Sequence, residues 1–154
     1  MAPEKRLCQP IPSPHIGGMS SPESRYEGRQ NDIRSLELPI IETFGNLYAD
    51  REYTVTMNVP EFTCVCPKTG LPDFATLTLD YVPDYDCIEL KSLKEYLLAY
   101  RNLGIFHENV INRVLDDVVK TCKPRRAKLT GVFHPRGGIQ TTVVRDYDAD
   151  RSNA

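Results

Sequence analysis

A change in the spacing of apolar residues along the chain restricts the fold more than any other sequence feature. Apolar side chains alternate with polar ones over residues 53–59 and 75–81, which is the period of a half-buried β-strand. After Asp86 the period lengthens to about 3.6 residues, which is the period of an amphipathic helix. Two helical runs follow, and then two strand-like runs over residues 127–134 and 139–147. The predicted order is strand, strand, helix, helix, strand, strand.

The two helical runs are separated by a break near residues 102–104, and the second ends before Lys123 and Pro124, where proline cannot continue a helix. Four antiparallel strands with a helix pair on one face satisfy the layer rule for an α+β domain. The other face of the sheet then needs a cover, which a second subunit or further helices would supply. The apolar helix positions are Leu90, Leu93, Tyr96, Leu97 and Tyr100, then Val110, Ile111, Val114, Leu115, Val118 and Val119.

The 154 residues divide into three regions. Residues 1–35 are rich in proline, glycine and serine without apolar periodicity, so we expect a disordered or loosely ordered extension. Residues 36–147 form the predicted folded domain, and residues 148–154 form a C-terminal tail. A domain of this size exposes strand edges, which favours a closed homo-oligomer.

Composition restricts the location and the partners. No apolar run approaches the roughly 20 residues of a membrane span, and the N-terminus lacks the basic and then apolar layout of a signal peptide, so we expect a cytoplasmic protein. The five cysteines lack framework spacing, which favours reduced thiols. A net charge of −2 gives no electrostatic footprint for nucleic acid, so a small-molecule partner is favoured.

The segment FTCVCPKTGLPDF, residues 62–74, is a candidate nucleophile loop. It holds Cys66 in a polar connection between two strand-like runs, and Asp73 lies seven residues further on as a candidate base. A thiol attacks as its thiolate, so Cys66 needs a base or a positive environment nearby. Two other interpretations are an inert thiol and a zinc site in which Cys64 and Cys66 are joined by His107 or His134.

One edge of the first helix is basic, since Lys91, Lys94 and Arg101 fall within roughly 80° of one another on a helical projection. We call these three residues the basic edge. A basic edge beside an apolar stripe suits a phosphate-bearing ligand, and Arg136 with Gly137 adds a forked donor with close backbone approach. A solvated face with Glu95 as counterion is the alternative.

Two glutamates are candidate anchors for a heterocycle. Glu89 opens the first helix near its apolar side, where either a ligand or the helix N-terminus would satisfy the carboxylate. Glu108 follows His107 just after the break between the helices. A buried glutamate accepts two hydrogen bonds from the edge of a guanine-like base.

In this order the residues resemble one family, the NADPH-dependent 7-cyano-7-deazaguanine reductases in their short single-domain form. The resemblance runs from about Glu42 to Tyr147 through NVPEFTCVCPKTGLPDFATL, IELKSLKEYLLAYRN, GIFHE and HPRGGI. The segment from Glu89 to Arg101 resembles the family's helix signature in its start E-[SL]-K-[SA]-x-K, here ELKSLK over residues 89–94, and in its closing aromatic-Arg pair, here Tyr100 and Arg101. The resemblance implies a tunnelling fold (T-fold), in which units of strand-strand-helix-helix-strand-strand order join into ring barrels, as pentamers or decamers, with active sites between neighbours.

The resemblance also implies a reaction, the four-electron reduction of the nitrile of 7-cyano-7-deazaguanine to a primary amine with two NADPH. This step lies on the route to the queuosine base of transfer RNA, and it acts on the free base with no direct contact to nucleic acid or membrane. Cys66 would form a covalent thioimide, Asp73 would help to ionise the thiol and protonate the nitrile nitrogen, and His107 would assist proton transfer, without a metal. The base would meet Ile88, Glu89, Leu90, His107 and Glu108, and the cofactor would meet Lys91, Lys94, Arg101, Arg136 and Gly137.

Two alternatives stay open within the same fold. A zinc-dependent enzyme of the cyclohydrolase or pterin-synthase kind would use Cys64, Cys66 and His107 as ligands. A non-catalytic purine-binding protein is the other alternative. We also consider a redox role for Cys64, which stands two residues before Cys66.

Overall fold

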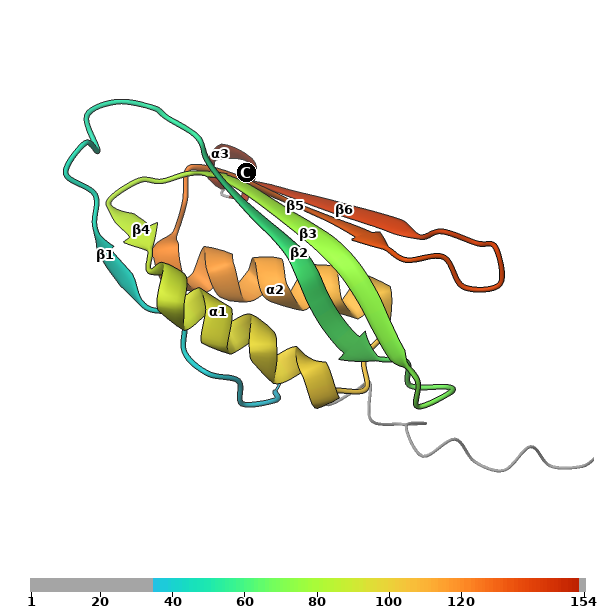
Figure 1. Ribbon diagram of the computed structural model, residues 1–154. Helices are drawn as coiled ribbons and strands as arrows, with labels where there is room; N and C mark the ends of the chain where they lie inside the picture. Colours follow the sequence, from blue (N-terminus) through green and yellow to red (C-terminus); the bar gives the residue numbers. More distant parts are fainter. Residues whose placement is uncertain (1–34, 153–154) are drawn as a thin grey trace, which may run out of the picture.

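The computed structural model describes residues 35–152 of the chain (Figure 1). The predicted N-terminal extension lies outside these residues except for Ser35, and so do residues 153 and 154 of the predicted tail. The predicted folded domain ends one residue before its last strand does. The elements are β1 (Thr43–Gly45), β2 (Val55–Val65), β3 (Pro72–Val82), β4 (Asp86–Ile88), α1 (Leu90–Leu98), the 3₁₀ helix η2 (Ala99–Asn102), α2 (His107–Cys122), β5 (Arg126–Phe133), β6 (Thr142–Asp148) and α3 (Ala149–Ser152).

The main sheet has four antiparallel strands in the order β2-β3-β5-β6. Helices α1 and α2 lie side by side on the same face of this sheet (Figure 1). This confirms the predicted α+β layers and the predicted antiparallel sheet. Both β2 and β6 are edge strands in the single chain, and β2 carries Pro60 at a register shift between Val59 and Phe62, as proline requires.

The sheet buries the face that the alternating pattern predicted. On β3 every second side chain from Asp73 to Tyr81 is buried, and β5 alternates in the same way up to Phe133. Helix α2 approaches β5 closely at Gly131, where an added Cβ would lie 2.5 Å from Cδ1 of Ile111. The absence of a side chain at Gly131 therefore lets α2 seat its apolar stripe directly on the sheet.

The helix boundaries follow from local chemistry. Glu89 caps α1, since its carboxylate accepts hydrogen bonds from the backbone N–H groups of Lys91 at 2.8 Å and Ser92 at 2.7 Å. These bonds lower the pKa of Glu89. Helix α2 ends as predicted before Pro124, with Lys123 in the left-handed conformation at φ 43°.

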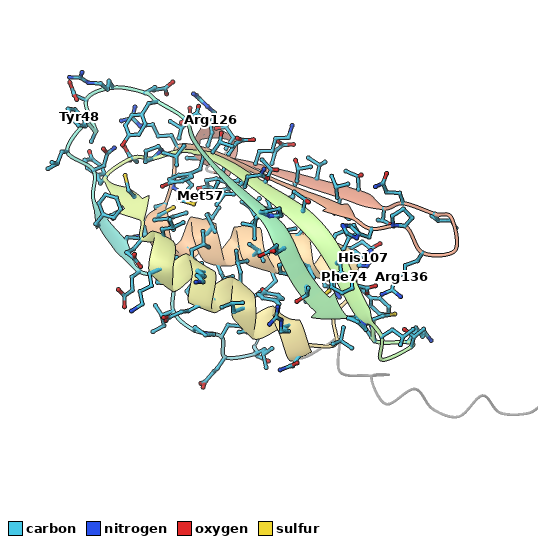
Figure 2. All side chains as sticks on the ribbon, in the orientation of Figure 1. Tyr48, Met57, Phe74, His107, Arg126 and Arg136 are labelled. Carbon is cyan, nitrogen blue, oxygen red and sulfur yellow. The ribbon has the colours of Figure 1, made fainter. Side chains whose placement is uncertain are left out.

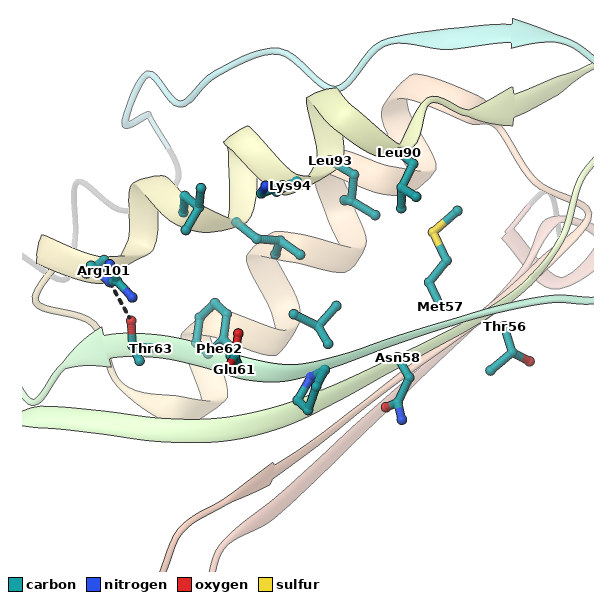
Figure 3. A pocket seen from close by; sticks show the side chains of 14 residues that line it. Thr56, Met57, Asn58, Glu61, Phe62, Thr63, Leu90, Leu93, Lys94 and Arg101 are labelled. Carbon is teal, nitrogen blue, oxygen red and sulfur yellow. Dashed lines mark hydrogen bonds between the residues drawn. The ribbon is translucent and has the colours of Figure 1, made fainter.

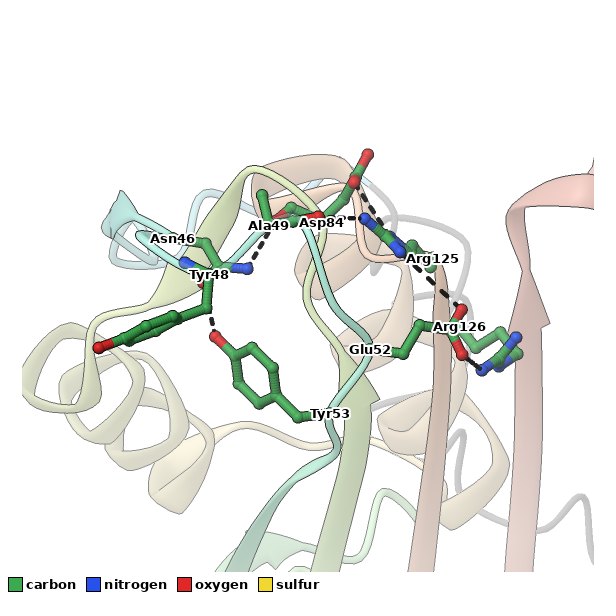
Figure 4. A network of polar contacts seen from close by, with 8 residues as sticks. All are labelled: Asn46, Tyr48, Ala49, Glu52, Tyr53, Asp84, Arg125 and Arg126. Carbon is green, nitrogen blue, oxygen red and sulfur yellow. Dashed lines mark hydrogen bonds and ion pairs between the residues drawn. The ribbon is translucent and has the colours of Figure 1, made fainter.

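A two-stranded sheet of β1 and β4 was not predicted, because three-residue strands are too short to show a period. It ties the start of the described chain to the start of α1, where the Glu89 N–H donates to the Glu42 carbonyl at 2.9 Å. The loop between β1 and β2 is held at the same end by Arg125, which bonds Asp84 at 3.1 Å and the Ala49 carbonyl at 2.7 Å (Figure 4). This end of the sheet is therefore well braced.

A buried polar network joins α1 to α2. The Tyr96 hydroxyl donates to Asp117 at 2.7 Å. Its one hydrogen is then used, so the Tyr100 hydroxyl donates to the Tyr96 oxygen across 2.8 Å. Arg113 donates to the same Asp117 oxygen at 2.7 Å and to the Leu36 carbonyl at 2.9 Å. Burial raises the pKa of both tyrosines, so each stays a neutral hydroxyl at any ordinary pH.

Replacing Asp117 by alanine should lower the free energy of unfolding by about 2–3 kcal/mol, because Tyr96 and Arg113 lose the acceptor they share. Asp116 is the matched control on the same helix, since its ion pair with Arg145 is largely exposed. Asp116→Ala should cost about 1 kcal/mol or less. Chemical denaturation of both variants measures the difference, and equal losses would contradict a buried network.

Among residues 35–152, no helix is both long enough and apolar enough to cross a membrane.

Candidate active site

The Cys66 turn is shorter than the sequence indicated. Strand β2 continues to Val65 and β3 begins at Pro72, so the connection is only residues 66–71. It is closed by two backbone hydrogen bonds, from the Cys66 N–H to the Leu71 carbonyl at 2.8 Å and from the Gly70 N–H to the Cys66 carbonyl at 2.9 Å. Gly70 takes a positive φ of 69°, which glycine adopts without strain.

The hairpin brings Cys66 and Asp73 to the same face. Asp73 is the direct cross-strand partner of Cys64 on β2. Cys66 lies two residues beyond Cys64, so its side chain leaves the same face of the hairpin, diagonal to Asp73. A spacing of seven residues in the sequence thus becomes a diagonal pair in space.

The Cys66 thiol has a pKa below its ordinary value. Burial opposes ionisation, but hydrogen bonds from the Thr69 hydroxyl and from the backbone N–H groups of Thr69 and Lys68 outweigh burial. The charge of Asp73 acts in the opposite direction and raises the pKa. The turn, rather than the carboxylate, therefore favours the thiolate.

Cys64 is a different kind of thiol. Its side chain is fully buried, with the sulfur 4.0 Å from the Ile105 carbonyl oxygen. Burial raises its pKa to about 12, and the negative charges of Asp73 and Cys66 add to the effect. A thiol that stays protonated and out of contact with solvent is a poor partner for redox chemistry.

Asp73 is a buried carboxylate with two cationic or protonatable neighbours. Its side chain is only 7% exposed, and His107 Nε2 lies 3.3 Å from Oδ2 while Arg136 Nη2 lies 2.6 Å from Oδ1. Arg136 also donates to the carbonyl of Pro72. These contacts compensate the burial of the carboxylate. We call Cys66, Asp73, His107 and Arg136 the thiol cluster.

His107 is held by stacking as well as by Asp73. Its ring lies 3.8 Å from that of Phe133 with an interplanar angle of 8°, and Phe133 is fully buried. His107 begins α2, and Phe133 ends β5, so the cluster forms where both elements meet the end of β3. The labels of His107 and Arg136 mark this end of the sheet in Figure 2, away from the loop between β1 and β2.

The basic edge borders a groove between α1 and β2 with a volume of about 610 Å³ (Figure 3). Lys94 and Arg101 line it together with apolar side chains such as Leu93 and Phe62. Arg101 Nε lies 3.5 Å from the Thr63 hydroxyl, three residues before Cys66. Lys91 does not line the groove and pairs with Glu95 at 3.9 Å, which is the counterion arrangement considered above.

The remaining predicted site residues lie elsewhere. Ile88 is buried in β4, Glu89 caps α1, and Leu90 lines the groove at its other end. Thirteen helical residues separate this end from the turn before α2, which corresponds to roughly 20 Å at about 1.5 Å per residue. A single chain therefore does not bring Glu89 next to Cys66.

Gly137 and Arg136 belong to a tight hairpin tip. Arg136 and Ile139 exchange backbone hydrogen bonds at 2.9 and 3.0 Å around Gly137 and Gly138, whose φ values are 57° and 81°. Two positive φ values in succession are typical of a type I′ turn, which explains the glycine pair without a ligand. Glu108 follows His107 in the first turn of α2 and is exposed.

Three contacts in this region were missed by sequence reasoning: Thr69 on the Cys66 sulfur, Arg136 on Asp73, and Phe133 on His107. The hydroxyl of Thr69 could have been noticed, because it lies within the same polar turn as Cys66. The contact of Arg136 with Asp73 depends on how β3 pairs with β5, and the contact of Phe133 with His107 depends on how α2 packs on β5. No local pattern in the sequence reveals either arrangement.

Among residues 35–152, no three side chains of His, Cys, Asp or Glu are grouped so that they could hold a metal ion. The thiol cluster instead combines a thiol favoured as thiolate with a buried acid, an imidazole and a guanidinium. Such a set can add sulfur to an electrophilic carbon and move protons to a neighbouring nitrogen.

Comparison with known proteins finds relatives for this arrangement. A family model described as QueF-like protein matches residues 72–152. The NADPH-dependent 7-cyano-7-deazaguanine reductase of Chlorobaculum tepidum is 57% identical over 112 residues, which span 73% of this chain and 96% of that protein. The reductase of the same name from Elusimicrobium minutum is 56% identical over 112 residues, spanning 73% and 84%.

A solved structure supports the fold. The crystal structure of the archaeosine synthase QueF-Like in the apo form superposes with a TM-score of 0.57. The two chains are 22% identical, and the match covers 60% of this chain and 91% of the other.

Proposed function

Because this chain belongs to the family of NADPH-dependent 7-cyano-7-deazaguanine reductases, we propose that it reduces the nitrile of 7-cyano-7-deazaguanine to the primary amine. The reaction consumes two NADPH and serves the formation of the queuosine base. One observation carries the proposal beyond family membership, the gathering of Cys66, Asp73, His107 and Arg136 at one end of the sheet.

Cys66 acts first. Its thiolate adds to the nitrile carbon, one π electron pair moves to the nitrogen, and a proton reaches that nitrogen to give a covalent thioimide. The proton lost by the thiol balances the proton gained by the nitrogen. The lowered pKa of the half-buried Cys66 supports this role, since the buried thiols Cys64 and Cys122 have pKa values raised to about 12 by burial.

Asp73 transfers the protons. It lies diagonal to Cys66 across the hairpin, and its contact with His107 gives a route along which a proton moves from imidazole to carboxylate. The sequence-based prediction assigns Arg136 to the cofactor. Its ion pair with Asp73 supports a different assignment, in which Arg136 holds this carboxylate in position.

The groove between α1 and β2 fits a dinucleotide. Its volume lies in the range of ligand sites, Lys94 and Arg101 supply charge for phosphates, and the apolar walls suit flat rings. NADPH supplies two hydrides in succession, one for the thioimide and one for the imine that follows. Lys91 lies on the same helix edge, where its ammonium can exchange Glu95 for a phosphate.

We infer that the base is bound between two copies of the chain in a T-fold ring. The roughly 20 Å between the Glu89 end of α1 and the turn before α2 supports this arrangement, as do the two edge strands, β2 and β6. Glu89 and the backbone of Ile88 and Leu90 then approach the thiol cluster from a neighbour, while Glu108 contributes from the same chain. Light scattering tests the assembly, and a monomer active at all concentrations would contradict it.

The function is tested by mixing the purified protein with 7-cyano-7-deazaguanine and NADPH and following the nicotinamide absorbance. Two NADPH should be oxidised for each base, and the product should be heavier by the mass of four hydrogen atoms. Guanine, which lacks the nitrile, is the matched control and should cause no oxidation. Stoichiometric zinc in the protein, with base turnover that leaves NADPH unchanged, would favour the zinc-dependent alternative.

A further inference from the structure

In the turn formed by residues 66–71, the Thr69 side chain has a hydrogen-bond donor available for the Cys66 sulfur. The Thr69 hydroxyl oxygen accepts a hydrogen bond from the backbone N–H of Leu71 at 3.3 Å. A hydroxyl has one hydrogen, and this contact leaves that hydrogen available for donation. The hydroxyl donates to the Cys66 side chain, beside the N–H groups of Lys68 and Thr69.

The turn keeps this geometry without help from the ligand. Its two closing backbone hydrogen bonds fix Cys66 and Leu71 opposite each other, and Gly70 takes the positive φ that the reversal needs. Successive N–H groups pointing into one concavity form an anion site in other turns, and here the group that the N–H donors contact is the sulfur of Cys66. The three donors come from two adjacent residues, so they move together.

We propose that Thr69 is a positioning residue for the reaction, which holds the Cys66 sulfur as a thiolate and receives it again when the sulfur leaves. The proposal rests on the proposed function, in which Cys66 is the nucleophile. The sulfur is an anion twice in that reaction: before it adds to the nitrile carbon, and after the reduced adduct expels it to give the imine. Donors that stabilise the thiolate favour both steps, because a more stable thiolate is also a better leaving group.

The other charged groups around Cys66 do not replace this role. Asp73 approaches from β3, and its negative charge opposes the thiolate, while Cys64 on β2 stays protonated. His107 Nε2 and Arg136 Nη2 both contact the Asp73 carboxylate and not Cys66. Lys68 lies in the same turn with an exposed side chain, so solvent screens its ammonium. The hydrogen bonds of the turn are therefore what lowers the pKa of Cys66.

The test is the pH dependence of Cys66 alkylation by iodoacetamide in a Cys8→Ser background, followed by peptide mass. Thr69→Val keeps the shape of the side chain and removes the hydroxyl. It should raise the pH midpoint of alkylation by about one unit, and the rate at pH 7 should fall about tenfold. Thr69→Ser restores the hydroxyl and should restore the midpoint. Thermal melts of each variant show that the fold is kept.

Lys68→Met is the matched control in the same turn, because it removes a charge and keeps the backbone donor. It should shift the midpoint by much less than Thr69→Val. An unshifted midpoint in Thr69→Val, or an equal shift in Lys68→Met, would overturn the proposal. The alkylation needs neither base nor cofactor, so a protein that never oxidises NADPH would refute the proposed function while the role of Thr69 on the sulfur is still measured.

Discussion

Replacing Cys66 by alanine should abolish nitrile reduction, with a fall in NADPH oxidation of about 10⁴-fold or more. The same change should remove the covalent adduct that intact mass detects when the protein is mixed with the base alone. The reason is that hydride addition needs the thioimide carbon, and only a sulfur at position 66 forms it in the proposed reaction. Cys66→Ser should behave alike, because a serine hydroxyl in this turn is not ionised near neutral pH.

Cys64→Ala is the matched control, since it removes the neighbouring sulfur from the same face of the hairpin. Cys64 is buried with its pKa raised, so the variant should keep the adduct and most of its activity. If the adduct survives Cys66→Ala and disappears in Cys64→Ala, the nucleophile is Cys64 and not Cys66. If the parent and the variants turn over the base but none of them forms an adduct, the reaction does not proceed through a covalent intermediate.

The layers of the fold could be predicted because each long element carries its own period. The alternation on β3 and the stripe on α2 extend over enough residues to separate a strand from a helix. Strands β1 and β4 were not predicted, because three residues define no period and their pairing joins segments more than 40 residues apart. The length of the Cys66 connection was overestimated, since a polar residue such as Thr63 continues a strand when its backbone is paired.

Part of the candidate site follows from short-range sequence and part does not. Cys66 and Asp73 share one hairpin, so their spacing was enough to place them together. Arg136 reaches Asp73 because the pairing of Ala75 with Phe133, continued beyond the end of β5, brings Arg136 opposite Pro72. Both helices lie between β3 and β5 in the sequence, so no hairpin turn fixes this register.

The basic edge shows how one sequence motif serves two needs. Glu89 precedes the basic edge and caps α1, which was the structural alternative considered for that residue. Lys94 and Arg101 face the groove, and Lys91 pairs with Glu95. Helix α1 and the following η2 line the groove proposed for the cofactor. The first residues of α1, at the far end from the turn before α2, can then contact another chain. The separation within one chain is thus consistent with the proposed site between subunits.

Replacing Asp73 by asparagine should slow NADPH oxidation by about 10²–10⁴-fold and leave binding of the base nearly unchanged, because the amide keeps the shape of the carboxylate and cannot carry a proton to nitrogen. Calorimetry measures the binding. Asp80→Asn, on the same strand and bonded to Thr56, is the control and should keep full activity.

The same Asp73→Asn variant separates two roles that a carboxylate beside a thiol can have. The negative charge of Asp73 raises the pKa of Cys66, so its removal should move the alkylation midpoint to lower pH. A variant that alkylates as fast as the parent and reduces the nitrile far more slowly has lost a proton donor. If alkylation slows in step with reduction, Asp73 is the base that ionises Cys66, and the turn around Thr69 is not sufficient for that step.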